Sequence, residues 1–259
     1  MISADPALTD SPPRFRLGAV VWAAGMLGVV AMAFFLPDMI RAFGEDPSDA
    51  PAWLPLAFVV QYGLLVALFS AIGAAVSRKL GLRAPVAEAL ASGSPVGPAL
   101  RPQVVPGVVG GVLGSVLLIS AAAFAPDSIT ALEGQWEPPL WLRVLYGGIT
   151  EEVLLRWGVM SGFVWLGWRF VQRRDGLPKP AVVWSAIIGS SLLFGVGHLP
   201  AAAALVGSLS GSVVAYVVLA NSLFGLIAGW LYWKRGLSAA IIAHIGAHVG
   251  SVAVAALFS

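Results

Sequence analysis

Two adjacent acids and an arginine lie inside a long apolar run, in the stretch Thr150-Glu151-Glu152-Val153-Leu154-Leu155-Arg156. An ionisable side chain at the centre of a bilayer costs about 3 kcal/mol even on forgiving scales, so each one needs a specific reason to be there. On a helix, Glu152 and Arg156 are spaced i, i+4, share one face and can form an ion pair. Glu151 projects about 100° away from Glu152 and is left without that partner. Glu151 is therefore the first candidate for chemistry.

All three histidines of the chain also lie in apolar segments. His198 ends the motif Phe194-Gly195-Val196-Gly197-His198 and is followed by Leu199-Pro200, which places it at a helix end. His244 and His248 are spaced i, i+4, so their imidazoles share one helix face and could grip a metal ion or two points of one substrate. Without a function, these histidines would form local or interhelical hydrogen bonds. The pair lacks the Glu of the His-Glu-x-x-His zinc-protease motif.

A carboxylate together with several imidazoles is the set that activation of water requires, since it supplies a base and donors for a developing oxyanion. A proton relay or a metal-ion path would use a similar set. Three classes of function therefore stay open: an enzyme, a proton-coupled transporter, and a catalytically silent membrane-binding or immunity-type protein that keeps the residues for packing. The sequence has little of the internal symmetry of transporters, which ranks that class last.

The elements that position these residues must be membrane-spanning helices. The chain is 58% hydrophobic and 11% charged, with a mean hydropathy of +0.87, whereas soluble domains carry roughly 25% charged residues. These values predict an all-α, polytopic helical bundle in a lipid bilayer. The absence of cysteine excludes disulfides and thiolate chemistry. The mild excess of positive charge lies in loops, so it is explained by membrane topology and indicates no nucleic-acid partner.

Seven apolar runs predict about seven spans, with a range of six to eight, and a catalytic cavity formed by the C-terminal-half helices. The runs are 17–37, 52–76, 104–125, 140–170, 181–199, 212–233 and 237–257. Residues 199–212 could be a loop or part of another span, and a short interfacial helix is expected around 84–90. We divide the chain into a disordered cytoplasmic tail (1–15), N-terminal scaffold helices (16–139) and a C-terminal domain that carries the candidate residues (140–254).

Loop charges predict the orientation of these spans. Basic residues occupy every second connection, and acidic residues, among them Glu133 and Glu137, occupy the connections between. By the positive-inside rule, the N-terminus lies in the cytoplasm and the C-terminus outside. We therefore expect a multi-pass protein of the cytoplasmic (inner) membrane.

The order of the motifs resembles the CPBP family of intramembrane proteases, which includes the type-2 CAAX-processing endopeptidases and Abi or bacteriocin-immunity-like proteins. The resemblance rests on Glu-Glu-x-x-x-Arg from Glu151, Phe-x-x-x-His ending at His198, and His-x-x-x-His from His244. It covers about Leu140 to Val254. It implies an intramembrane endopeptidase that acts on a membrane-embedded or membrane-associated protein or peptide.

The resemblance also implies a role for each residue. Glu151 would activate water with the assistance of His198, while His244 and the residue four positions on would stabilise the oxyanion, and Glu152 and Arg156 would support the site. This chain has His248 where the family pattern has Asn; an imidazole can still donate a hydrogen bond. It also adds a third possible nitrogen ligand, so Glu151 with the three histidines is an alternative metal site and zinc a possible cofactor. The family has been described both as metal-dependent and as a metal-independent glutamate protease, and both mechanisms stay open.

Overall fold

The computed structural model describes residues 12–132 and 138–257, and these residues form helices and connecting turns without a β-strand. The helices are α1 (Arg14–Ala42), α2 (Leu54–Val76), α3 (Pro85–Ser92), α4 (Val96–Ala122), α5 (Asp127–Thr130), α6 (Leu140–Leu142), η4 (Arg143–Glu151), η5 (Val153–Met160), α7 (Ser161–Leu166), η6 (Gly167–Val171), α8 (Pro180–Gly197), α9 (Leu199–Val206), α10 (Gly211–Arg235) and α11 (Leu237–Ala255). Short 3₁₀ turns, η2 (Pro47–Asp49) and η3 (Ser77–Leu80), lie beside α2.

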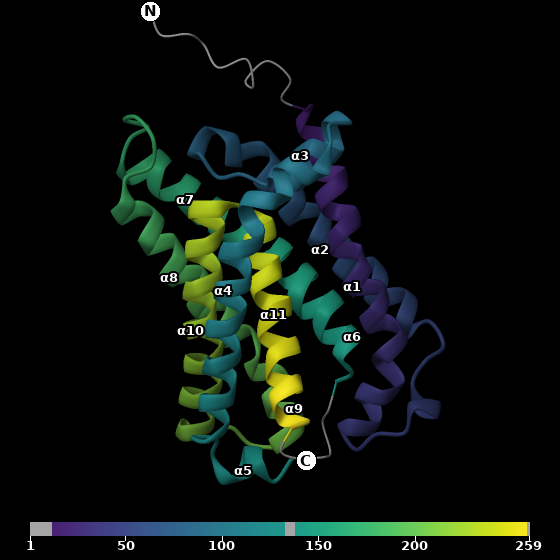
Figure 1. The fold of residues 1–259 in the computed structure, drawn as a ribbon. Coiled ribbons are helices and arrows are strands. Elements are labelled where there is room, and N and C mark those ends of the chain that lie inside the picture. Colours follow the sequence, from purple (N-terminus) through teal and green to yellow (C-terminus); the bar gives the residue numbers. More distant parts are fainter. Residues whose placement is uncertain (1–11, 133–137, 258–259) are drawn as a thin grey trace, which may run out of the picture.

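Six helices among the described residues are long and apolar enough to cross a membrane. They are α1, α2 with η3, α4, α8 with α9, α10 and α11. A seventh helical run, from α6 to η6, also passes between the two ends of the bundle (Figure 1). It carries Glu151, Glu152 and Arg156 near its middle, and its hydrogen bonding alternates between α and π. The predicted all-α bundle of about seven spans is confirmed.

The π-helical segments η4 and η5 meet at the two adjacent acids. In such segments the chain closes i→i+5 hydrogen bonds, and π-turns of this kind occur frequently at functional sites. The wider turn directs the side chains of Glu151 and Glu152 differently from those of a regular α-helix. A sequence pattern of period 3.6 does not reveal this change.

Three boundaries differ from the sequence-based prediction. The helix α4 begins at Val96 and not near 104, because Pro102 and Pro106 lie within it and did not end it; prolines are tolerated in membrane helices when neighbouring helices satisfy the freed carbonyls. Residues 199–206 are helical and extend the span of α8. The helix α1 begins at Arg14, inside the predicted tail, and residues 1–11 of that tail lie outside the described part of the chain.

The ends of the bundle separate the loop charges as the alternation predicted. Figure 1 shows α3, the loop between η6 and α8, and the turn between α10 and α11 at the end where α1 begins. These connections hold the basic residues, whereas α5 and the η2 turn, with Asp46 and Asp127, lie at the opposite end. The acids Glu133 and Glu137 fall outside the described residues.

The helix α11 is packed tightly between α4 and the run that carries the acids. A Cβ added to Gly111 on α4 would lie 3.0 Å from Cα of Gly246 on α11. Glycines at such contacts let two backbones approach closely within a membrane. On the other side, a Cβ added to Gly148 would lie 2.4 Å from Cγ1 of Ile245. The position of α11 therefore depends on both neighbours.

Candidate active site

The candidate residues come from three separate elements of the C-terminal half. Glu151 and Glu152 lie where η4 meets η5, His198 lies between α8 and α9, and His244 and His248 lie on α11. Apart from His198, these side chains form one contiguous cluster through the contacts described next.

Glu152 is fully buried between a guanidinium and an imidazole. Its Oε2 lies 3.3 Å from Nε of Arg156, and both side chains are 0% exposed. Its Oε1 accepts a hydrogen bond of 2.9 Å from Nδ1 of His244. The structure contains the ion pair that the i, i+4 spacing predicts. The contact with His244 joins residues 92 positions apart, so spacing along one helix could not reveal it.

Glu151 faces the other nitrogen of the same imidazole. Its Oε2 lies 4.0 Å from Nε2 of His244, and the Glu151 side chain is 17% exposed, against 0% for Glu152. A separation of 4.0 Å is too long for a hydrogen bond, and polar groups at such a distance are commonly bridged by water. Of the two acids, Glu151 is the accessible one.

Hydrogen bonding determines the tautomer of two of the histidines. A carboxylate or a carbonyl oxygen can only accept. Nδ1 of His244, bonded to Glu152, and Nδ1 of His198, bonded to the Phe194 carbonyl at 2.8 Å, must therefore both carry the proton. In each neutral ring, Nε2 then carries a lone pair that can accept a hydrogen bond or a proton.

The two imidazoles of α11 lie together over a glycine of η4. The His244 and His248 rings stack with centroids 5.0 Å apart. A Cβ added to Gly147 would lie 3.0 Å from Nε2 of His248 and 3.7 Å from Nε2 of His244. Both Nε2 atoms thus point toward Gly147, and the missing side chain provides their space.

His198 reaches the cluster through an aromatic ring. The Phe194 ring contacts the His198 ring edge-on at 4.8 Å and the His244 ring at 6.0 Å. His198 also lies within electrostatic range of His248. Beyond His198, α9 continues the helical span by a further eight residues.

Two aromatic rings that the sequence analysis did not assign to the site lie against it. The guanidinium carbon of Arg156 lies over the face of the Phe194 ring, 5.3 Å from its centroid. The centroids of the Phe224 and His244 rings are 4.5 Å apart. Nη1 and Nη2 of Arg156 have no hydrogen-bond partner among the described residues. The charge of Arg156 is therefore balanced by Glu152 and by the Phe194 ring.

The described residues contain no group of three or more His, Cys, Asp or Glu side chains arranged to hold a metal ion. Glu152 accepts a hydrogen bond from Nδ1 of His244 and leaves its Nε2 free. The alternative metal site formed by Glu151 and the three histidines therefore stays a prediction.

Two cavities lie away from this cluster. One, of about 360 Å³, lies between α1 and α2 beside Phe15 and Trp22, and the other, of about 420 Å³, lies between α7 and α8 beside Phe163 and Val182. Neither is lined by a candidate catalytic residue. The predicted cavity around Glu151 stays a prediction.

Comparison with known proteins gives one family. Residues 134–250, about 45% of the chain, match the model described as type II CAAX prenyl endopeptidase Rce1-like. No curated protein and no solved structure shows a significant match to the chain. The matched segment contains all the candidate residues, and the suspected resemblance is confirmed. Over residues 134–250, the chain is similar to the Rce1-like type II CAAX prenyl endopeptidases.

Proposed function

We propose that the protein is an intramembrane endopeptidase that hydrolyses a peptide bond in a membrane-associated protein or peptide. The observation that carries the proposal is the pairing of Glu151 with Nε2 of His244 across 4.0 Å. Both groups can accept a proton, and Glu152 fixes the imidazole that lies between the two acids. The family match supports a membrane protease as the general class.

In the proposed mechanism, a water molecule lies between Glu151 and His244. Glu151 takes a proton as the water oxygen attacks the carbonyl carbon of the scissile bond. The carbonyl oxygen becomes an oxyanion, which needs a hydrogen-bond donor. His248 can donate from Nε2 in the tautomer that protonates that atom, and His244 can donate from Nε2 only after it gains a second proton. The proton taken by Glu151 finally passes to the leaving amine.

The remaining charged residue holds the site in place. Arg156 pairs with the fully buried Glu152, and Glu152 in turn orients His244. We assign His198 the role of an assisting group, because its Nε2 lone pair is free while the ring contacts Phe194. We also propose that the N-terminus lies in the cytoplasm, as the basic connections indicate.

The test compares two substrates and two variants in purified, lipid-reconstituted protein. The family description names prenylated CAAX substrates, so a farnesylated CAAX peptide and the same peptide without the prenyl group are the probes. Glu151→Gln should lose at least about 100-fold in turnover, as expected when a general base is removed. Glu45→Gln, an acid in the exposed turn after α1, is the matched control and should keep full activity.

Two further outcomes separate the mechanisms. Undiminished turnover by Glu151→Gln would refute the assigned base. Because the proposed water activation uses a carboxylate and an imidazole, turnover should survive treatment with a strong chelator. Loss of activity with the chelator, and its return with Zn²⁺, would refute this mechanism while leaving the endopeptidase function standing.

A further inference from the structure

The helix that carries His244 and His248 is capped by residues from the other half of the chain. The N-cap residue of α11 is Gly236, which has no side chain with which to cap. Instead, the Arg83 carbonyl accepts a hydrogen bond of 3.1 Å from the Leu237 amide. Oε1 of Gln103 accepts one of 3.3 Å from the Ala239 amide, which also bonds the Gly236 carbonyl. Amides in the first turn of a helix lack the usual i→i−4 partner. The Arg83 carbonyl satisfies the Leu237 amide, and Gln103 shares the Ala239 amide with the Gly236 carbonyl.

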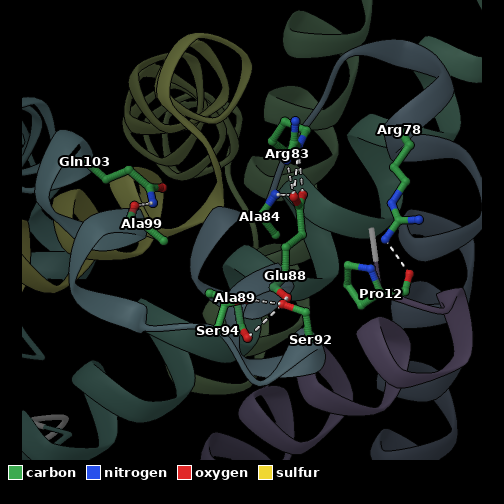
Figure 2. Close-up of polar contacts among 10 residues, drawn as sticks. All are labelled: Pro12, Arg78, Arg83, Ala84, Glu88, Ala89, Ser92, Ser94, Ala99 and Gln103. Atoms are coloured by element: carbon green, nitrogen blue, oxygen red, sulfur yellow. Dashed lines mark hydrogen bonds and ion pairs between the residues drawn. The ribbon is translucent and has the colours of Figure 1, made fainter. Parts of the chain in front are cut away.

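Gln103 is held at both ends of its amide. The residue is 1% exposed, and its Nε2 donates a hydrogen bond of 2.8 Å to the Ala99 carbonyl, one turn earlier on α4 (Figure 2). Its oxygen is thereby aimed at α11. A Cβ added to Gly236 would lie 2.9 Å from this oxygen, and Gly236 has a φ of +109°. Glycine is therefore required at the point where Gln103 meets the start of α11.

The other cap, the Arg83 carbonyl, is held by an ion pair. Figure 2 shows the Glu88 carboxylate at the turn before α3, where it accepts hydrogen bonds of 2.9 Å from Nε of Arg83 and 3.0 Å from the Ala84 amide. The hydrogen bond that Arg83 donates to the Glu88 carboxylate raises the pKa of Arg83 above its ordinary value. The turn is thus fixed at physiological pH.

We infer that Gln103 is a positioning residue for the reaction, because it sets the axial position of α11 and so of both imidazoles. This inference rests on the proposed function. His244 lies five residues beyond Ala239, about 7.5 Å along the helix. It must meet Glu152 at 2.9 Å and Glu151 at 4.0 Å. A displacement of α11 by 1 Å would disturb both distances. Gln103 lies outside the segment that matches the family.

The experiment removes the cap and then restores part of it. Gln103→Met deletes both hydrogen bonds at similar volume. Gln103→Glu keeps an acceptor for the Ala239 amide in either protonation state. Gln61→Met makes the same chemical change on the exposed face of α2 and is the matched control. The full-length protein is assayed in lipid for kcat and KM on the peptide substrate, and for amide hydrogen exchange in the first turn of α11.

The expected result is a loss of kcat of about tenfold or more in Gln103→Met, since misplacement by 1 Å can cost about 100-fold, with little change in KM. Exchange should speed up at Leu237–Ala240, whereas the first turn of α10, capped by Oγ of Ser210 on the Val213 amide, should not change. Gln103→Glu should recover most of the lost kcat, and the control should match wild type. Should the Met variant not fold, Gln103→Asn, whose shorter amide reaches only one partner, replaces it.

Unchanged kcat in the cap-deficient variant would overturn the inference, and so would an equal loss in Gln103→Glu. Faster exchange with normal turnover would contradict the positioning role alone and leave the endopeptidase function intact. A wild-type protein without endopeptidase activity would contradict the proposed function, and this inference with it.

Discussion

Gly147 gives the two imidazoles of α11 their space, and a single added methyl group there should lower turnover without unfolding the protein. In Gly147→Ala, the new Cβ would lie 3.0 Å from Nε2 of His248. Ordinary contacts of this kind are 3.4 Å or longer, so the ring, the helix or both must move by about 0.4 Å or more. Since a misplacement of 1 Å costs about 100-fold in rate, we expect a loss of about three- to tenfold in kcat.

Gly162→Ala is the matched control for this experiment. Gly162 lies in the same helical run, and a Cβ there would meet only Ile72, at an ordinary 3.7 Å. In a helix, Ala is favoured over Gly by about 1 kcal/mol, so both variants gain the same intrinsic stability. Any difference between them then reports the contact with the imidazoles.

The assay is steady-state cleavage of the peptide substrate in lipid, with thermal unfolding measured on the same samples. We expect Gly162→Ala to keep wild-type kcat and Gly147→Ala to keep a near wild-type unfolding temperature. Wild-type kcat in Gly147→Ala would refute the placement of His248 against η4. A collapse of stability in that variant alone would show that Gly147 serves packing and not the position of the imidazoles.

Three further changes test the surroundings of the site and the loop after α1. Glu152→Gln leaves the buried guanidinium of its ion-pair partner without a counter-charge, and should destabilise the protein by about 3 kcal/mol or more in equilibrium unfolding; a change below 1 kcal/mol would contradict the buried pair. Gly73→Ala would place a Cβ 2.3 Å from Nε1 of the fully buried Trp157, and should cost about 1–3 kcal/mol in the same measurement. The pKa of Asp46 is held below its ordinary value by the Ser48 amide and then by the Ser48 hydroxyl; Ser48→Ala should raise that pKa only part of the way in an NMR titration, because the amide remains.

The number of spans could be predicted because it depends on local sequence. A bilayer requires about 20 apolar residues for each helix, and six of the seven runs satisfy this by length and composition. The predicted start of α4 was wrong because Pro102 and Pro106 resemble signals that end a helix. In a membrane such prolines remain inside a helix, so the same residues carry less information there than in water.

The residues of the candidate site could be predicted from the sequence, but the contacts between residues on different helices could not. The spacing of Glu152 and Arg156 was enough to indicate their ion pair, since both lie on one helix. The bond between Glu152 and His244 joins two helices, and depends on how α11 is packed. The close contacts at Gly147, Gly148 and Gly158 likewise depend on neighbouring helices, whereas the surroundings of Gly162 have room for a side chain.

The part of the chain outside the family match determines the geometry of the part within it. Thr150, next to the two acids, donates a hydrogen bond of 2.6 Å to the Gly25 carbonyl on α1, and Nε1 of Trp157 donates one of 3.1 Å to the Ser70 carbonyl on α2. The opposite side of the site, α11, is capped by Gln103 at the start of α4. The two elements that face each other at Glu151 and His244 are therefore held by different N-terminal helices, the first by α1 and α2 and the second by α4. Since the proposed reaction depends on the 4.0 Å separation between Glu151 and His244, we expect the N-terminal helices to influence catalysis by setting that distance, without contributing a catalytic side chain.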